Sequence, residues 1–330
     1  MPTTTTPSYA HSLHEAGFVI IPSLLPASSL PRLQQVSTTA TTLARSGSWP
    51  HFRTVPKQFP PWPSTPPSAA EGGIWGVQHL LHPDMPGREE FAGVYFHERV
   101  LGVVEGLLGL DRDEYQEGGL GGEEGGEEKL VMELFNLLIA PEGQDFELRW
   151  HRDDIPWTAS AEEEERLLSS KSPGGRQSHA QYNLALCADR SLIVVPGSHG
   201  RVRTDTERNA DPYEGNLPGQ VVVELGPGDA VFYDSNILHR GVYRAKVEGG
   251  EESRLTLHGS IGVKEEVDGG EGVGVDGDNK VRATAVLQHG VGAWVHRDDA
   301  VFGIGGRAEK MRANLVAMGT GDGVGFSLQG

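Results

Sequence analysis

Short apolar segments, several with alternating hydrophobic and polar positions, fill the middle of the chain. They are rich in β-branched residues and end at turn signals such as Pro196-Gly197. Many short strands separated by Gly-rich turns are typical of a β-sandwich or barrel. The predicted strands are residues 130–140, 146–151, 181–188, 191–195, 220–225, 230–233 and 254–263.

Before this β-rich region the apolar residues recur mainly at helical spacing. A short helix is predicted over residues 9–16, followed by Gly17 and a strand over 18–21. A second helix begins near Pro26, and one continuous helix is predicted over 91–108. Helices therefore flank the N-terminal side of the β-core.

Two of the predicted strands carry a polar face. Gln181 and Asn183 alternate with apolar residues on one strand. Arg254, Thr256 and His258 do so on the other. Because the opposite faces are apolar and must pack on something, these strands favour a barrel-like fold with a polar interior.

Acidic, Gly-rich tracts interrupt the patterned segments at residues 117–129, 162–165 and 264–280. Such sequences are typical of solvated loops, so we expect insertions in one core rather than domain boundaries. The predicted organisation is a disordered segment at 1–8 and one domain over 9–263 with loop insertions at 117–128 and 158–178. Residues 264–330 are expected to form an acidic, Gly-rich loop and a C-terminal extension that packs on the same domain.

The strongest candidate for chemistry is His151-Arg152-Asp153. In an extended segment residues i and i+2 point the same way, so His151 and Asp153 can bind one ion from one side. His239, just after the predicted strand 230–233, supplies a third ligand. Two histidines and a carboxylate suit non-haem Fe(II) and leave positions open for substrate and oxygen. Two alternatives stay open at this point: a surface turn without metal, and a zinc site.

Composition narrows the class of protein. The chain has 330 residues, with 28 basic and 46 acidic side chains and a net charge of −18, which disfavours nucleic acid and anionic membranes as partners. Its single cysteine, Cys187, fits a reducing compartment. No apolar stretch approaches about 18 residues, and the N-terminal residues lack the features of a secretory signal. We therefore expect a cytoplasmic protein without a membrane segment.

Several motifs together resemble the phytanoyl-CoA dioxygenase (PhyH) family of Fe(II)/2-oxoglutarate oxygenases. LHEAGFVIIPSLLPASSLPRL (13–33) resembles the family's N-terminal opening, and WHRDD (150–154) resembles its H-x-D segment. LIVVPGSHG (192–200) is similar to its PGSH turn, and LGPGDAVFYDSNILHRG (225–241) to the block that holds the distal histidine. Three features depart from the family pattern: Asp189-Arg190-Ser191 stands in place of Asn-Gly, YRAKVEGGEES lengthens the segment before Arg254, and residues after Lys264 have no counterpart.

The resemblance implies a mainly β fold, namely a double-stranded β-helix (jelly-roll, cupin-like) core with flanking N-terminal α-helices. It implies that His151, Asp153 and His239 bind Fe(II). It also implies that Arg254 pairs with the distal carboxylate of the cosubstrate 2-oxoglutarate and that O2 is the second cosubstrate. An arginine suits that role because its planar guanidinium binds a carboxylate through two parallel hydrogen bonds.

Three polar residues share the face of these groups. Thr256 is expected to add a hydroxyl donor for the cosubstrate, and Gln181 and Asn183 to contact cosubstrate or substrate, or only to line the interior. Halogenating relatives lack the carboxylate that Asp153 supplies, so the expected reaction is hydroxylation of a small-molecule metabolite with release of succinate and CO2. The alternative is a non-catalytic jelly-roll protein that binds a small molecule. Neither the substrate nor the oligomeric state follows from the sequence.

Overall fold

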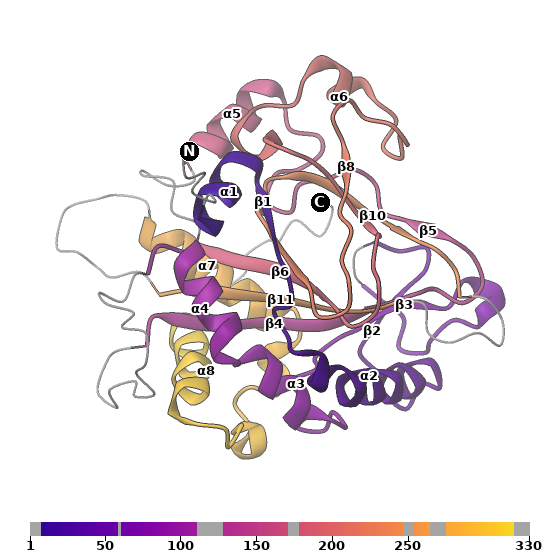
Figure 1. Ribbon diagram of the computed structural model, residues 1–330, viewed down its shortest axis with the longest axis vertical. Helices are drawn as coiled ribbons and strands as arrows, with labels where there is room; N and C mark the ends of the chain where they lie inside the picture. The colour runs from indigo at the N-terminus through magenta and orange to yellow at the C-terminus, as the bar shows by residue number, and fades with distance from the viewer. Residues whose placement is uncertain are drawn as a thin grey trace, which may run out of the picture.

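Two antiparallel sheets form the centre of the computed structural model, which describes residues 8–58, 61–110, 128–170, 178–246, 254–264 and 275–319. The larger sheet has the strand order β1-β9-β6-β11-β4-β3-β2, and the smaller has the order β5-β10-β7-β8 (Figure 1). The larger sheet contains β1 (Phe18–Ile21), β2 (Phe52–Thr54), β3 (Ile74–Val77), β4 (Leu130–Ile139), β6 (His179–Ala185), β9 (Ala230–Tyr233) and β11 (Leu255–Val263). The smaller sheet contains β5 (Phe146–Glu147), β7 (Leu192–Val195), β8 (Val221–Val222) and β10 (Leu238–Tyr243).

Apolar side chains from the two sheets pack against each other in two separate clusters. In one, Val231 of β9 packs with Leu192 and Val194 of β7. In the other, Trp75 of β3 packs with Phe146 and Tyr243 of the smaller sheet. The sheets therefore lie face to face, as the jelly-roll prediction requires.

The strands with a polar face are neighbours in the larger sheet. In the register of β6 and β11, Gln181 lies opposite Ser260 and Asn183 lies opposite His258. Leu184 and Leu257, on the other face, join the main hydrophobic core. Alternation thus places polar groups on the inner face and apolar groups on the helix-covered face, which confirms the polar interior that the sequence indicated.

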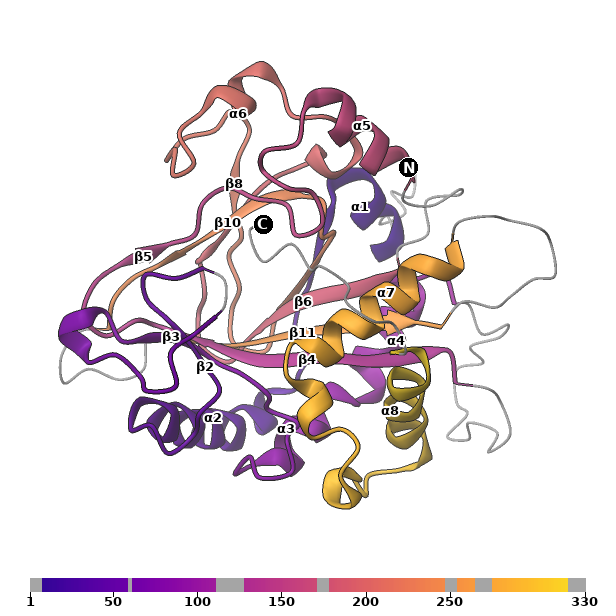
Figure 2. The same ribbon diagram turned by 180° about the vertical axis from the view of Figure 1, so that it is seen from behind.

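Helices cover the outer face of the larger sheet. They include α2 (Leu30–Arg45), α3 (Arg88–Tyr95) and α4 (Glu98–Leu107), and α1 (Tyr9–Ala16) precedes β1 (Figure 1). Two C-terminal helices, α7 (Val275–Gln288) and α8 (Gly306–Met318), lie beside β4 and β11 (Figure 2). More of the described residues lie in helices than in strands. The prediction of a mainly β fold therefore underestimated the helix content. The structure is mixed and has C-terminal as well as N-terminal helices.

Several predicted elements have different bounds. The single helix expected over 91–108 is two helices, because the chain breaks after Tyr95 and His97 caps α4 by accepting a hydrogen bond from the Arg99 amide at 3.2 Å. Strand β6 ends at Ala185, and β5 and β8 contain two residues each. Strands β2, β3 and β10 were not predicted, since β2 and β3 lie in stretches rich in Pro, Gly and Trp, and β10 follows closely on β9.

The acidic tract at 162–165 is not a solvated loop. It lies in helix α5 (Ala161–Ser170), and Glu164 is completely buried. Ser8 is also ordered, because its side chain caps α1. The loop predicted over 264–280 is also wrong at its end, because residues 275–280 belong to α7. Residues 1–7, 117–127 and 265–274 lie outside the described residues, so the loop and disorder predictions made there are not addressed. The assignment of residues 9–263 to one domain, with residues 264–330 as an extension that packs on it, stays a prediction. Among the described residues, no helix combines the length and apolar character needed to cross a membrane.

Candidate metal centre

Three side chains from two chain segments converge between the sheets. His239 lies on β10, and His151 pairs with it through an isolated β-bridge with two backbone hydrogen bonds of 3.0 Å. Asp153 Oδ1 lies 3.6 Å from His151 Nε2 and 3.7 Å from His239 Nε2. One ligand atom from each residue lies within 4.8 Å of the others, which is close enough to bind one metal ion. The backbone pairing of the two segments therefore brings together the three residues that the sequence singled out.

Backbone carbonyls orient both histidine rings. His151 Nδ1 lies 2.8 Å from the Arg149 carbonyl oxygen, and His239 Nδ1 lies 2.9 Å from the Ile237 carbonyl oxygen. Because a carbonyl only accepts, each Nδ1 must carry the proton and donate it. Each Nε2 is then the unprotonated ring nitrogen and faces Asp153, which is the form of histidine that binds metals.

Asp153 is held on both sides. Its backbone amide donates to the Ser235 carbonyl at 2.8 Å, and its Oδ2 accepts a hydrogen bond from Gln181 Nε2 at 2.8 Å. The remaining oxygen, Oδ1, is the one that faces the two histidines. Its neighbour Asp154 instead accepts a hydrogen bond from the Ser235 hydroxyl at 2.6 Å. The register that the H-x-D spacing predicted, with Asp153 rather than Asp154 at the centre, agrees with this geometry.

Burial and charge keep these groups in their metal-binding forms. Burial lowers the pKa of His151 to about 4, so the ring is neutral near pH 7. Burial by itself would raise the pKa of Asp153, but the two histidines and the Gln181 amide stabilise the anion, so the pKa is lowered. A carboxylate with two neutral imidazoles is a suitable donor set for a divalent cation.

Arg254 and Thr256 meet at one carboxylate. Asp189 Oδ2 accepts hydrogen bonds from Arg254 Nε at 3.1 Å and from the Thr256 hydroxyl. Burial by itself would lower the pKa of Arg254, but the negative charge of Asp189 outweighs this effect, and the pKa is raised. The guanidinium lies over the Tyr243 ring, and its NH1 atom is buried without a hydrogen-bond partner. Asp189, which the sequence showed only as a departure from the family pattern, thus holds Arg254 from one side.

The other predicted polar residues have protein partners. Gln181 bonds to Asp153, and Asn183 Oδ1 lies 2.8 Å from His258 Nδ1. Burial lowers the pKa of His258 to about 3. Neither His258 nor His179 belongs to the metal-binding group found among the described residues.

Sequence reasoning missed the residue between the two H-x-D ligands. Arg152 is buried and donates to the carbonyls of Ser198 and Asn236, and its Nε lies 3.1 Å from Glu164 Oε1. Glu164 also pairs with Arg203 and Arg208. The sequence signal for this role was the position of Arg152 between two candidate ligands. Its partner Glu164 could not be identified, because it lies in an acidic tract whose composition indicated a solvated loop.

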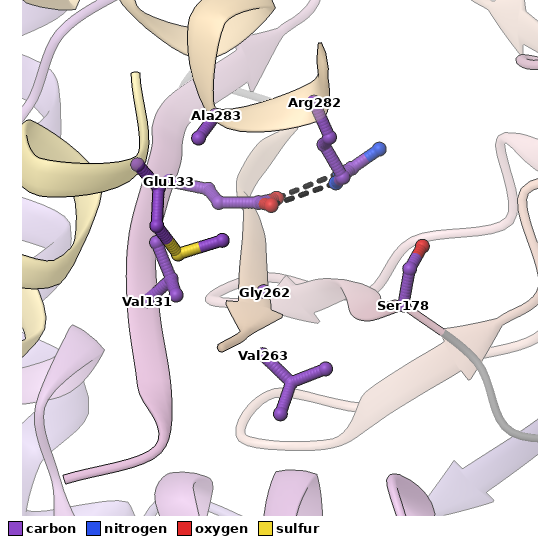
Figure 3. Close-up of a pocket in the computed structure, with 8 residues that line it drawn as sticks. Val131, Glu133, Ser178, Gly262, Val263, Arg282 and Ala283 are labelled. Atoms are coloured by element: carbon purple, nitrogen blue, oxygen red, sulfur yellow. Dashed lines mark hydrogen bonds and ion pairs between the residues drawn. The ribbon is translucent and has the colours of Figure 1, made fainter. Parts of the chain in front are cut away.

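Another ion pair lies near the start of β4, where Glu133 is buried and Arg282 is half-buried. Arg282 of α7 donates to both carboxylate oxygens of Glu133 at 2.7 and 2.6 Å, next to Ser178 and Gly262 (Figure 3). A Cβ atom on Gly262 would lie 2.5 Å from Glu133 Oε1, so a larger residue there would displace this carboxylate from Arg282. Helix α7 thus supplies a charged side chain to the sheet that holds Gln181.

Comparison with known protein families agrees with this arrangement. Residues 13–242 match the family model described as phytanoyl-CoA dioxygenase (PhyH), and all three residues of the metal centre lie in that range. The chain belongs to the PhyH family. Members of this family are Fe(II)/2-oxoglutarate-dependent oxygenases, and the His-Asp-His group of this chain is its candidate facial triad.

Solved structures with a similar fold are distant from this PhyH chain. AviO1 from Streptomyces viridochromogenes Tue57 is 17% identical, with 77% of this chain and 93% of that chain covered and a TM-score of 0.48. EctD from S. alaskensis, solved with 2-oxoglutarate and 5-hydroxyectoine, is 16% identical, with 77% and 75% covered and a TM-score of 0.46. The α-ketoglutarate-dependent epimerase SnoN from nogalamycin biosynthesis is 17% identical, with 77% and 80% covered and a TM-score of 0.45. No curated protein matches the chain.

Proposed function

We propose that this chain is a dioxygenase that uses Fe(II), 2-oxoglutarate and O2 to hydroxylate a small-molecule metabolite, with release of succinate and CO2. The observation that carries the proposal is the joint presence of the His151–Asp153–His239 group and a buried arginine with an unsatisfied nitrogen on the same inner face. A protein that only binds a small molecule needs neither a metal centre nor a second anion-binding group.

The donor set fits Fe(II). Two neutral imidazoles and one carboxylate are the protein ligands of non-haem iron oxygenases and leave other coordination positions open. When bound there, iron supplies the activation of O2 and the oxidative decarboxylation of 2-oxoglutarate. The protein's part is to keep the three ligands deprotonated at their metal-binding atoms and to hold them in place, which Arg149, Ile237 and Gln181 do through their hydrogen bonds.

Arg254 and Thr256 suit the distal carboxylate of 2-oxoglutarate. The NH1 atom of Arg254 is buried and lacks a partner, which is costly unless a ligand supplies an acceptor. Asp189 takes the Nε side of the guanidinium and Tyr243 also bonds to it, so NH1 is the nitrogen left for the cosubstrate. We assign Thr256 a supporting role, because its hydroxyl can turn from Asp189 to a bound carboxylate.

Gln181 and Asn183 serve the site in different ways in this proposal. Gln181 acts through Asp153, whose second oxygen it holds. Asn183 fixes the ring of His258 on the inner face, at a position opposite it on β11. Both amides retain further hydrogen-bonding capacity for cosubstrate or substrate.

The two apolar clusters between the sheets lie on either side of these polar groups across the larger sheet, because β9 is next to β6 and β4 is next to β11. The Val231–Leu192–Val194 cluster and the Trp75–Phe146–Tyr243 cluster therefore exclude water from the two sides of the polar region. Exclusion of water strengthens the interaction between Arg254 and a bound carboxylate, because the local dielectric is low. It also protects reactive species from side reactions.

An aerobic metabolite screen tests the proposal. Purified protein is incubated with Fe(II), 2-oxoglutarate and pooled metabolites, and products are read by mass spectrometry for the gain of one oxygen atom or the loss of two hydrogen atoms. Succinate formation is followed in parallel, with the Asp153→Ala variant as the control. Succinate and an oxidised product from the wild type alone support the proposal. A chain that binds metabolites but never consumes 2-oxoglutarate is a binding protein instead.

A further inference from the structure

Arg53 is an inner-face residue that the metal centre and the cosubstrate site leave unexplained. It lies on β2 opposite Gly76 of β3. Its neighbour Phe52 joins the helix-covered core, so alternation directs Arg53 toward the interior between the sheets. Gly76 makes room for this side chain, because a Cβ atom there would lie 3.3 Å from Arg53 Cδ.

The Arg53 guanidinium has no polar partner among the described residues. Its Nε is buried without a hydrogen bond, and none of the described carboxylates forms an ion pair with it. The arginines that are fully buried among the described residues are all paired with a carboxylate. These pairs are Arg152 and Arg203 with Glu164, Arg240 with Glu147, and Arg254 with Asp189.

Arg53 lies close to the reacting centre. Its guanidinium carbon lies 5.1 Å from the centroid of the Trp75 ring, which stacks on Tyr243 at 5.5 Å. Burial lowers the pKa of Arg53, and the groups that act on it electrostatically are Tyr243, Tyr233 and Asp153. Asp153 is the only carboxylate among them, and a metal ion would neutralise its charge. The loaded site therefore leaves Arg53 without an anion.

Arg53 is half-buried, and its Nε is cut off from water without a hydrogen-bond partner. An unpaired guanidinium held in this way on the inner face points to a ligand that supplies an acceptor of opposite charge. We propose that Arg53 binds a carboxylate of the substrate, and that the substrate is therefore an organic acid. This inference rests on the proposed function, because it assigns one more group to the same site. The planar guanidinium gives the carboxylate two parallel hydrogen bonds and so fixes the orientation of the molecule relative to the metal.

In this proposal Arg53 and Arg254 bind two different anions: Arg254 binds the cosubstrate, and Arg53 binds the substrate. Thr256, Leu138, Gly76 and Arg53 are successive register partners on β11, β4, β3 and β2. Strands lie about 4.8 Å apart, so the backbones of Thr256 and Arg53 are separated by about 14 Å. Arg254 lies over Tyr243, and Arg53 lies over Trp75. Two guanidiniums on two different rings provide places for two carboxylates.

Binding of simple acids tests the assignment without turnover. Protein loaded with Zn(II) and saturating 2-oxoglutarate is titrated with acetate and benzoate, and with the matched neutral amides acetamide and benzamide, by ligand-observed NMR. We expect the acids to bind and the amides not to bind. Arg53→Met should lose at least tenfold in acid affinity, Arg53→Lys should lose less, and Arg99→Met, at an exposed helix position, should match the wild type. Equal acid binding by wild type and Arg53→Met would overturn the proposal.

Two further measurements distinguish substrate binding by Arg53 from a role in cosubstrate binding and from a structural role. The affinity for 2-oxoglutarate should change less than threefold in Arg53→Met. A loss of affinity as large as that in Arg254→Met would make Arg53 part of the cosubstrate site and overturn the assignment. The melting temperature of Arg53→Met should equal or exceed that of the wild type, because an unpaired interior charge is removed. A marked fall in melting temperature in both the Met and Lys variants would show a structural role instead.

The metabolite screen then distinguishes failure of this inference from failure of the proposed function. If 2-oxoglutarate is turned over with organic acids and not with their methyl esters, both stand. Turnover restricted to neutral metabolites overturns the role of Arg53 and leaves the oxygenase intact. If no turnover occurs but acids still bind through Arg53, the oxygenase proposal fails while the anion site remains.

Discussion

Asp189 shows how one buried carboxylate can prepare an arginine for a ligand. It accepts from Arg254 Nε and from the Thr256 hydroxyl, while its other oxygen accepts from the Ser191 amide at 2.8 Å. Its pKa is lowered because Arg254 and these donors outweigh the effect of burial. The charge of Arg254 is thus balanced before 2-oxoglutarate arrives, and the orientation of the guanidinium is fixed, which reduces the entropy cost of binding.

Replacing Arg254 with methionine should weaken 2-oxoglutarate binding and spare the metal. Truncating one partner of a buried, hydrogen-bonded charge pair costs about 2–5 kcal/mol, which corresponds to roughly 30- to 3,000-fold in affinity. The KM for 2-oxoglutarate should rise accordingly, with Fe(II) affinity largely unchanged. Arg244→Met is the matched control, because Arg244 is exposed and pairs with Asp145 at 2.6 Å. An unchanged KM in Arg254→Met rejects the assignment.

At the scale of elements, helix α5 connects an insertion to the metal-binding segment. Glu164 on this helix binds Arg152, Arg203 and Arg208, and Arg152 in turn bonds to the carbonyls of Ser198 and Asn236. Asn236 lies three residues before His239, and Arg152 lies between His151 and Asp153. The helix therefore helps to hold both ligand segments in one position.

Glu164→Gln should lower the stability of the protein by about 3–5 kcal/mol, because it leaves several buried arginines without their carboxylate. Chemical denaturation of the metal-free protein measures this loss. Glu163→Gln, one residue away and exposed, should change the free energy of unfolding by less than about 0.5 kcal/mol. Equal effects of the two substitutions would show that the arginine cluster does not support the fold.

The same helix marks the limit of prediction from sequence. Local patterns correctly indicated α1, β1, β4 and β11, because their periodicity or β-branched content is strong. The H-x-D spacing likewise indicated the candidate ligands, since it depends only on extended geometry. Glu164 and Arg53 were missed because their roles come from contacts with residues far away in the chain, and the acidic composition around Glu164 indicated solvent.

At the scale of the whole molecule, buried neutral histidines make stability depend on pH. Burial lowers the pKa of His79 to about 3, of His179 to about 4 and of His258 to about 3. In the unfolded chain these histidines take up protons below about pH 6.5. The folded protein resists that uptake, so its stability is complete above about pH 6.5 and is lost as the pH falls toward 4.

Urea denaturation of metal-free protein at several pH values between 7.5 and 4.5 measures this dependence. Each such histidine contributes a slope of about 1.4 kcal/mol per pH unit in the range between its two pKa values. His179→Gln should therefore flatten the curve, whereas His11→Gln, at an exposed helix position, should not. A free energy of unfolding that stays constant from pH 7 to pH 5 would contradict this behaviour.

The most direct test of the metal centre is anaerobic titration with Fe(II) in the presence of 2-oxoglutarate, followed by visible absorption. Wild type and Asp154→Ala should bind Fe(II) stoichiometrically and develop a band that requires 2-oxoglutarate, because Asp154 bonds to Ser235 rather than facing the histidines. Asp153→Ala, His151→Ala and His239→Ala should each lose the band, since each removes one of three protein ligands. Full Fe(II) binding and colour in Asp153→Ala, with their loss in Asp154→Ala, would contradict the assignment of this site.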